Sequence, residues 1–259
     1  MIDLEEIKKY LSTTIIGSKI FYFDSIDSTN IYAKNLCTEE TQDGTVIIAE
    51  EQTQGRGRFN RKWQSEKGKN LTFSIILQPT TQLENIGLLP ICTGGAIAKA
   101  IERHIDLKTE CKWPNDILIS SKKVCGILIE SFLSNNFKNR FVLGIGINVN
   151  QEIFSGDIIN TATSLKLSNG KTVNRIQLLA GVLKSLDEMY INIQNVNFDI
   201  PLNEWLSRSS MFGNEITIQQ GDKVLRGKAV RLDNDGSLVL NCEGKEIKVF
   251  SGDVTIRKQ

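Results

Sequence analysis

"KVCGILIES", residues 123–131, is an apolar run that starts with a lysine and contains a single glycine. Such a run predicts a buried β-strand. "RFVLGIGINVN", residues 140–150, predicts a second one, with Gly144 and Gly146 in its interior. A glycine inside a strand weakens it unless another group must approach the backbone closely. Two neighbouring strands of this kind could leave a slot for a flat, mostly apolar ligand.

Further strands are predicted on the N-terminal side of this pair. "GTVIIAE" (44–50) is a continuous apolar run, and "NLTFSIIL" (70–77) alternates apolar with polar residues at the period of two that strands have. A glycine- and arginine-rich segment joins these two, so it should form a long hairpin arm. "KIFYFDSI" (19–26) predicts an earlier strand, and "ECKWPNDILIS" (110–120) predicts two strands joined by a turn at Pro-Asn-Asp.

Helical spacing of apolar residues appears in several other segments. Helices are predicted over 4–11, directly after residue 27, within 86–105, over 175–193 and over 201–206. Ser28 or Thr29 is a suitable N-cap for the second of these, and Asn174 for the fourth. Residues 151–173 show neither period and predict an irregular connection.

The character of the chain changes near Met211. From there on, short alternating runs are separated by Gln-Gly-Asp, Asn-Asp-Gly and Glu-Gly-Lys, at a spacing typical of a small β-barrel. We therefore expect two units, residues 1–210 and residues 211–259.

Composition restricts the class of protein. The chain has 259 residues, of which 40% are hydrophobic and 24% charged, as in ordinary soluble globular proteins. The sequence contains no apolar run of about 18 residues, so no membrane span is expected. The charged start "MIDLEEIKKYL" lacks the apolar core of a secretion signal, so a cytoplasmic location is expected.

Cysteine and histidine content argues against several kinds of site. The five cysteines contain no C-x-x-C pair, and their dispersal indicates reduced thiols. They are Cys37, Cys92, Cys111, Cys125 and Cys242. His104 is the single histidine, which makes a structural zinc site or a Ser-His-Asp mechanism a poor fit. We interpret His104 as a helix-end residue and Cys125 as a small buried hydrophobe.

Positive charge is concentrated in "GRGRFNRKW", residues 55–63. Residues 55–69 hold six basic residues and one acidic residue, whereas the whole chain has a net charge of only +1. The planar guanidinium group of arginine can bind two phosphate oxygens at once, and glycines let backbone amides approach an anion. The pattern is neither a P-loop nor a Rossmann fingerprint. It favours phosphate binding, with a solvated arm or a nucleic-acid contact as alternatives.

Two further features lie near the predicted slot. "KWPND", residues 112–116, is either a simple tight turn or a functional group of a cation, an aromatic ring and a carboxylate. Lys123 stands at the entrance of an apolar strand, where a lysine either extends to solvent or points into a site.

Taken together, five blocks resemble the biotin–protein ligases over nearly the whole chain. They are "DSTN" (27–30), "EEQTQGRGRFNRKW" (50–63), "KWPND" (112–116), "KVCGILIE" (123–130) and "GIGINVN" (144–150). The resemblance implies an α+β fold, in which flanking helices cover a mixed β-sheet and a small SH3-like β-barrel follows at the C-terminus.

The resemblance also implies a reaction and its partners. Biotin's carboxylate would attack the α-phosphate of MgATP to give biotinyl-5′-AMP, and an acceptor lysine would then take the biotinyl group. The acceptor would be a biotin carboxyl carrier protein. Both reactants of the first step are anions, so cationic groups suit it. Either a monomer or a homodimer is compatible with the sequence.

Site residues follow from the resemblance position by position. The implied biotin-binding residues are Ser28, Thr29, Asn30, Gln52, Gly55, Arg56, Gly57, Lys123 and Gly126, and Gly144 would help to shape the biotin slot. The implied ATP-binding residues are Arg58, Arg61, Trp63, Asn115, Lys123 and Asn148. The implied catalytic residues are Lys123, Arg58 and Asp116, the last also as a ligand of Mg²⁺.

One residue departs from the family pattern, and three alternatives accompany the resemblance. Asn60 stands where the family usually has glycine; asparagine tolerates left-handed geometry better than most residues. A lipoate ligase of the same fold should show a different arginine-glycine signature. A biotin sensor without catalysis would not need Arg58, Lys123 and Asp116 together. A DNA-binding regulator needs a helical domain for which the residues before the first strand leave no room, so no DNA partner is expected.

Overall fold

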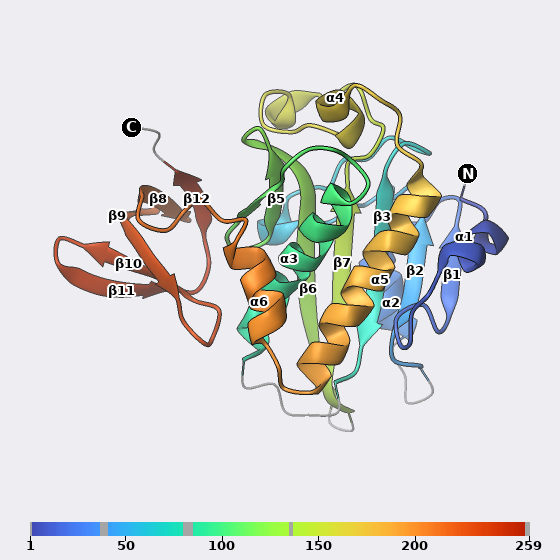
Figure 1. Ribbon diagram of the computed structural model, residues 1–259, viewed down its shortest axis with the longest axis horizontal. Helices are drawn as coiled ribbons and strands as arrows, with labels where there is room; N and C mark the ends of the chain where they lie inside the picture. The colour runs from blue at the N-terminus through green and yellow to red at the C-terminus, as the bar shows by residue number, and fades with distance from the viewer. Residues whose placement is uncertain (1, 37–40, 80–84, 135–136, 257–259) are drawn as a thin grey trace.

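The central element of the structure is a mixed sheet of seven strands (Figure 1). The computed structural model describes residues 2–36, 41–79, 85–134 and 137–256. The strand order is β1-β2-β3-β7-β6-β5-β4, with β1 parallel to β2 and every other neighbour antiparallel. The strands are β1 (Ile20–Phe23), β2 (Thr45–Ala49), β3 (Leu71–Leu77), β4 (Glu110–Lys112), β5 (Asp116–Ile119), β6 (Lys122–Ser134) and β7 (Phe137–Ile147).

Helices cover both faces of this sheet. In Figure 1, α3, α5 and α6 lie over one face and α2 lies over the other; α1 packs against α5. The α-helices are α1 (Leu4–Tyr10), α2 (Thr29–Leu36), α3 (Leu89–Glu102), α4 (Leu165–Asn169), α5 (Arg175–Gln194) and α6 (Asp199–Leu206). Short 3₁₀ turns are η1 (Arg58–Asn60), η2 (Ile86–Leu88) and η3 (Gly156–Ile158).

The two faces of the sheet have different chemistry because side chains alternate along each strand. On the face under α3 and α5, rows of apolar residues cross the sheet and join the main core. These rows are Leu71–Ile147–Cys125, Phe73–Ile145–Ile127 and Ile75–Leu143–Ile129. On the α2 face, two corresponding rows contain glycines and hydroxyl residues in place of large apolar ones at most positions, namely Thr72–Gly146–Gly126 and Ser74–Gly144–Leu128. The second face is therefore suited to hold a ligand.

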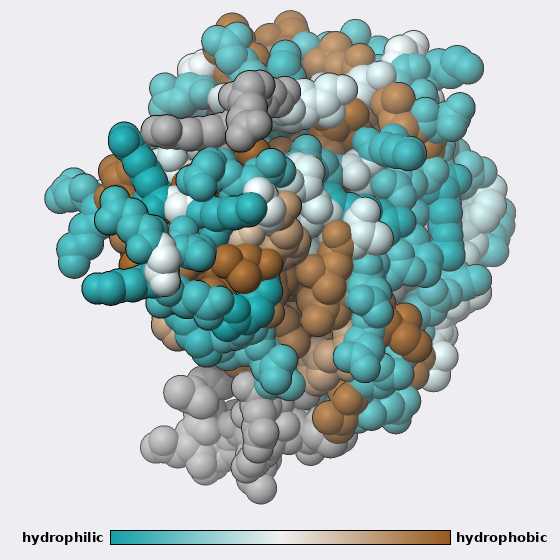
Figure 2. All heavy atoms as spheres, turned by 60° about the vertical axis from the view of Figure 1, so that its left-hand side comes forward, coloured by the Kyte–Doolittle hydropathy of each residue, from teal (hydrophilic) through white to brown (hydrophobic). Residues whose placement is uncertain are grey.

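The C-terminal residues form a separate antiparallel sheet of five strands, on the left of Figure 1. Its order is β11-β10-β9-β8-β12. The strands are β8 (Glu215–Gln220), β9 (Lys223–Leu232), β10 (Leu238–Cys242), β11 (Lys245–Val249) and β12 (Asp253–Ile256). This is the part of the chain for which we predicted a small barrel. Figure 2 views this side and shows a mostly hydrophilic surface with a band of hydrophobic side chains near its middle.

The turn between β9 and β10 fastens this sheet to the larger one. The indole Nε1 of the buried Trp113 donates a hydrogen bond of 3.1 Å to the carbonyl oxygen of Gly236. A Cβ on Gly87 would lie 1.8 Å from the carbonyl oxygen of Asp235, so only glycine permits this approach. Trp113 belongs to the predicted "KWPND" turn, which therefore also serves as a docking point.

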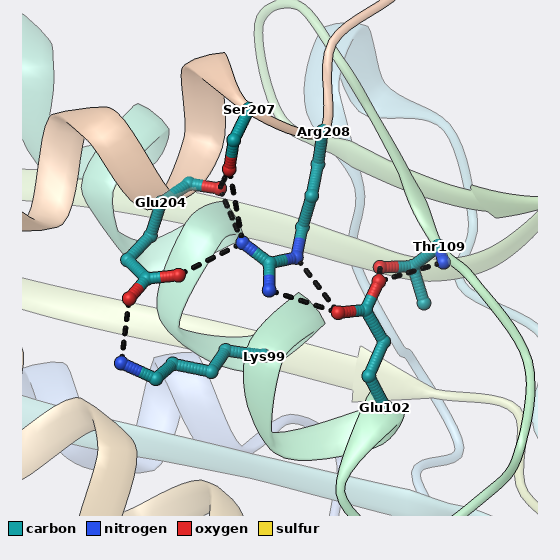
Figure 3. Close-up of polar contacts among 6 residues, drawn as sticks. All are labelled: Lys99, Glu102, Thr109, Glu204, Ser207 and Arg208. Atoms are coloured by element: carbon teal, nitrogen blue, oxygen red, sulfur yellow. Dashed lines mark hydrogen bonds and ion pairs between the residues drawn. The ribbon is translucent and has the colours of Figure 1, made fainter.

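A second fastening lies where α6 leads into the C-terminal sheet (Figure 3). Arg208 forms ion pairs of 2.8 Å with Glu102 of α3 and with Glu204 of α6. Glu204 also pairs with Lys99, and Glu102 accepts hydrogen bonds from the backbone and side chain of Thr109. These contacts hold the end of α6 against α3.

Most predicted elements are confirmed within one to four residues. The predicted irregular stretch 151–173 contains one short helix, α4, whose N-cap Ser164 accepts a hydrogen bond from the backbone N–H of Leu167. His104 follows the end of α3 and contacts the carbonyl oxygens of Ala100 and Gln177, in agreement with its interpretation as a helix-end residue. Cys37 lies outside the described residues. No helix among the described residues is long and apolar enough to cross a membrane.

The end of β2 is anchored by a buried ion pair. Glu50, whose side chain is fully buried, accepts hydrogen bonds from Arg175 of α5 at 2.7 Å and from the backbone N–H of Ile2 at 2.6 Å. Burial alone would raise the pKa of Glu50, but these hydrogen bonds and the charge of Arg175 outweigh it and lower the pKa. The same arginine also donates to the carbonyl oxygen of Asn70, at the start of β3.

We predict that Glu50→Gln lowers the free energy of unfolding by about 3 kcal/mol at neutral pH, because it leaves Arg175 buried without a counter-charge. Since the pKa of Glu50 is lower in the folded chain than its ordinary value of 4.5, the contribution of the pair is complete above that pH and is lost as the pH falls further. Urea titrations at pH 7 and pH 3.5 should therefore show a smaller difference between variant and wild type at the lower pH. An equal difference at both values would contradict the assignment.

Candidate active site

A cavity of about 380 Å³ opens on the α2 face of the seven-stranded sheet. This volume lies within the range of small-molecule sites. Nearly all the predicted site residues line it. They are Ser28, Thr29, Asn30, Gln52, Arg56, Gly57, Arg58, Arg61, Trp63, Asn115, Asp116, Lys123, Gly126, Gly144 and Asn148. Gly55 is the exception; it is buried beside the cavity, and a Cβ there would lie 2.6 Å from the carbonyl oxygen of Trp63.

The floor of the cavity is the cross-strand pair Gly126 and Gly146. The indole of Trp63 lies directly on it. A Cβ on Gly146 would come within 2.3 Å of the ring, and one on Gly126 within 3.0 Å. The slot predicted from these glycines exists, and in this structure it accommodates a flat side chain of the protein itself. Gly144 has a related role, because a Cβ there would lie 2.2 Å from Asn30 Oδ1.

The basic segment 55–63 forms a closed loop above this floor. Its ends are joined by a hydrogen bond of 3.0 Å from the Trp63 N–H to the Gly55 carbonyl oxygen, and its middle by one of 2.7 Å from the Gly57 N–H to the Arg61 carbonyl oxygen. The left-handed residue of the loop is Phe59, with a φ of 54°, and not its neighbour Asn60. The tolerance of asparagine for that geometry is therefore not what this loop uses.

Lys123 reaches the cavity because of an irregularity in the sheet. The register of β5 against β6 shifts between Ile117 and Leu118, opposite Lys123. A bulge of this kind redirects side chains and is common beside active sites. The lysine Nζ lies 2.6 Å from Asp116 Oδ1. Its backbone is held by Thr161, whose carbonyl oxygen accepts from the Lys123 N–H at 2.7 Å.

A second cation stands near this pair. Arg58 donates a hydrogen bond of 3.0 Å to Asn115 Oδ1, while Asn115 Nδ2 donates to the carbonyl oxygen of Ile127 at 2.6 Å. Burial lowers the pKa of Arg58, and the neighbouring carboxylates of Asp253 and Asp116 oppose that effect. The cation is thus incompletely compensated, as suits a group that meets an anion.

The other end of the cavity is neutral and rich in hydrogen-bonding groups. The backbone N–H and hydroxyl of Thr29 both donate to Gln52 Oε1, at 2.8 and 3.0 Å. Asn30 and Ser74 continue this network; Ser74 Oγ lies 2.6 Å from Asn30 Oδ1 and 2.7 Å from Thr29 Oγ1. The cavity therefore has a cationic end and an end at which uncharged hydrogen-bonding groups predominate, with Arg56 beside them.

Three buried polar atoms of the cavity have no hydrogen-bond partner among the described residues. They are Trp63 Nε1, Asn148 Oδ1 and Asp116 Oδ1. The ion pair of Asp116 with Lys123 does not have hydrogen-bond geometry, which is why that oxygen belongs to this group. Buried polar atoms are seldom left unpaired, so the Trp63 donor and the Asn148 acceptor point to a polar ligand.

Sequence reasoning missed several lining residues. Lys112 is the first residue of the "KWPND" block, so its position beside the site could have been predicted from the sequence. Ile158 and Ala162 come from the stretch predicted as irregular, and Asp253 comes from β12, where it pairs with Arg61 of the loop. No sequence signal connects residues so far apart. Cys125 is fully buried and burial raises its pKa, which agrees with its interpretation as a hydrophobe.

The chain is similar to known protein families along most of its length. Residues 22–148 match the model of the "Biotin/lipoate A/B protein ligase family", and residues 211–257 match that of the "Biotin protein ligase C terminal domain". A bifunctional ligase/repressor BirA of Bacillus spizizenii is 32% identical over 253 residues, which is 97% of this chain and 78% of that one. The chain belongs to this family of protein ligases.

Other members of the family agree with this assignment. A biotin–[acetyl-CoA-carboxylase] ligase of Mycobacterium tuberculosis is 30% identical over 82% of this chain and 79% of its own. The structure of a biotin protein ligase from Aquifex aeolicus in complex with biotin and ATP superimposes with a TM-score of 0.79 at 31% identity, over 93% of this chain and 100% of that one. The α+β fold and the C-terminal sheet of this chain are those of the family.

We predict that Gly146→Ala lowers the free energy of unfolding by roughly 1–3 kcal/mol, because the added methyl collides with the Trp63 ring. Chemical denaturation measures the loss, and indole emission reports the displaced ring. In a Trp63→Ala background the same substitution should cost much less, since the clash is gone. An equal cost in both backgrounds would show that the ring does not rest on Gly146.

Proposed function

We propose that this protein activates biotin with ATP and transfers the biotinyl group to a lysine of a biotin carboxyl carrier protein. The observation that carries the proposal is the arrangement of the cavity, in which Arg58, Lys123 and Asp116 lie at one end and Thr29 and Gln52 at the other. Biotin has a polar ureido ring and an anionic carboxylate, so it matches both ends. Relatives crystallised with biotin and ATP support the same assignment.

In the first step, an oxygen of the biotin carboxylate forms a bond to the α-phosphorus of ATP, and the bond to the pyrophosphate oxygen breaks. Two anions must approach each other, so the barrier depends on fixed positive charge. Lys123 and Arg58 supply it; Asn115 and Asp116 orient them through the hydrogen bond and the ion pair described above. The charges are placed before the reaction, which avoids reorganisation.

In the second step, the ε-amine of the acceptor lysine attacks the acyl carbon of biotinyl-5′-AMP, an amide bond forms and AMP leaves. The adenylate is reactive toward water, so its enclosure matters. Residues 55–63, with Arg56 and Gly57 among them, form the cover in this proposal. Trp63 Nε1 and Asn148 Oδ1 offer a donor and an acceptor to the adenine of the nucleotide.

Magnesium is proposed to bind with the nucleotide. The donor set fits this mode, because Mg²⁺ usually takes only one or two carboxylates and completes its shell with phosphate oxygens and water. Asp116 is the carboxylate suited to it, and no cluster of three or more His, Cys, Asp or Glu occurs among the described residues. When bound, the ion would neutralise phosphate charge.

The individual assignments stay proposals of this kind. The proposed biotin-binding residues are Ser28, Thr29, Asn30, Gln52, Gly55, Arg56, Gly57, Lys123 and Gly126. The proposed ATP-binding residues are Arg58, Arg61, Trp63, Asn115, Lys123 and Asn148. Residues 1–210 would form the catalytic unit and residues 211–259 the C-terminal unit. We also predict a cytoplasmic location and no DNA partner. Both a monomer and a homodimer are compatible with the proposal.

We predict biotin-dependent release of pyrophosphate when the protein is given MgATP, and labelling of the carrier lysine when a biotin carboxyl carrier domain is added. Lipoate in place of biotin should support neither. Pyrophosphate release and mass spectrometry of the carrier measure the two steps. Turnover without biotin, or labelling with lipoate alone, would overturn the proposal.

We predict that Lys123→Ala lowers the rate of adenylate formation at least about 100-fold, because the main positive charge beside the reacting oxygens is lost. Biotin affinity measured without nucleotide should fall far less. Lys122→Ala is the matched control; Lys122 is the exposed neighbour at the start of β6 and does not line the cavity. Single-turnover kinetics with wild-type rates for Lys123→Ala would remove that residue from the mechanism.

A further inference from the structure

Glu130 occupies an unexpected position on the α2 face of the sheet. It stands in the cross-strand row Ile76–Val142–Glu130, next to the row that contains Gly144. Val142 and Ile76 are fully buried and belong to the small apolar cluster under α2. An apolar residue would suit this place, and only 18% of the Glu130 side chain is exposed. A carboxylate there must be compensated by specific partners.

Three partners converge on this carboxylate. Asn30 Nδ2 donates to Glu130 Oε2 at 2.8 Å, and Lys34 Nζ donates to Oε1 at 3.1 Å. Arg56, from the loop over the cavity, places Nη1 3.7 Å from the same Oε1. Burial would raise the pKa of Glu130, but these hydrogen bonds and charges outweigh it and lower the pKa. Glu130 is therefore an ionised group that can only accept hydrogen bonds.

This acceptor determines which way the Asn30 amide faces. The reverse orientation would place the amide oxygen against a carboxylate oxygen and lose the hydrogen bond. When Nδ2 donates to Glu130, Oδ1 faces Ser74 and accepts a hydrogen bond of 2.6 Å from its hydroxyl. Asn30 is 5% exposed, and a Cβ on Gly144 would lie 2.2 Å from its Oδ1, so the amide packs tightly against the sheet.

The effect extends to the cavity wall. The Ser74 hydroxyl donates toward two acceptors, Asn30 Oδ1 and Thr29 Oγ1. The Thr29 hydroxyl in turn donates to Gln52 Oε1 at 3.0 Å. The backbone N–H of Thr29 also donates to that oxygen, so Gln52 Nε2 remains available as a donor. The orientation of the Asn30 amide therefore limits how the hydroxyls of this wall share their protons.

We propose that Glu130 is a positioning residue that fixes the Asn30 amide and, through it, the hydrogen-bonding pattern of the biotin end of the cavity. The inference rests on the proposed function, since it assigns this end to biotin. Glu130 does not line the cavity, so its action on the ligand passes through its partners. Asn30 carries the positioning role, whereas Arg56 responds to the charge of Glu130, which Glu130→Gln also removes.

Calorimetric titration with biotin, without nucleotide, tests this role on the full chain. Glu130→Leu keeps the approximate shape and removes the acceptor, and should raise the biotin Kd about tenfold, the usual scale for a buried polar group left unpaired. Glu130→Gln retains an oxygen for Asn30 Nδ2, and should stay within about threefold of wild type. In steady state, the KM for biotin should rise in Glu130→Leu while the KM for ATP changes less than about twofold.

The matched control is Glu102→Gln in the ion-pair group of Figure 3. Glu102 is similarly buried, with 24% of its side chain exposed, and it also accepts several hydrogen bonds, but it does not line or adjoin the cavity. It should lower the unfolding temperature and leave the biotin Kd unchanged. Asn30→Ala combined with Glu130→Leu should cost little more than either change alone, because both act through one contact.

Several results would overturn the proposal. Glu130→Leu with a wild-type biotin Kd would do so, as would an equal loss in Glu102→Gln, which would make the effect one of general stability. An equal loss in Glu130→Gln and Glu130→Leu would show that the charge matters and not the orientation of Asn30. If the wild-type protein itself bound no biotin, the proposed function would fail first, and the positioning role with it.

Discussion

The contact of the Trp63 ring with bare backbone at Gly126 and Gly146 is the constraint on which the site depends. Two sheets that pack face to face normally lie about 10 Å apart, because side chains fill the space between them. Here two opposed glycines remove that spacing, and the loop 55–63 can descend to the sheet itself. Because the loop carries the arginines, its close approach is what brings Arg58 to Asn115 and sets it beside Lys123. Larger residues at either glycine would lift the positive charge away from the place where it is needed.

The same sheet separates stability from chemistry by its two faces. Apolar rows on the α3 and α5 face build the core, and the small and polar rows on the α2 face build the cavity. The shift of register at Ile117 and Leu118 breaks the alternation along β6, and there it brings Lys123 to the α2 face. A strand can therefore be almost wholly apolar and still place one cation in a site.

Much of this was visible in the sequence, and the reasons are physical. Strands such as 70–77 and helices such as 175–193 have local periods that their burial imposes, so they were predicted closely. The glycines of β6 and β7 indicated that some group approaches the strand backbone closely, but they did not indicate which group. The shift of register beside Lys123 and the contact of Asp253 with Arg61 arise from pairing between distant segments, and no local pattern records them. Glu130 was part of a quoted motif, yet its role depends on Asn30, a hundred residues earlier.

The two ends of the cavity differ in how firmly their donors and acceptors are fixed. At the polar end, Glu130 and the backbone N–H of Thr29 have fixed roles as acceptor and donor, and the hydroxyls and amides between them must adapt to these limits. At the cationic end, Asn115 holds Arg58 by a single oxygen, and the carboxylate of Asp116 forms an ion pair with Lys123. A neutral ring that must be recognised by shape and hydrogen bonds requires the first arrangement. In the proposed reaction, a centre whose charge changes requires the second arrangement, because its partners would exchange contacts with phosphate as the bond forms.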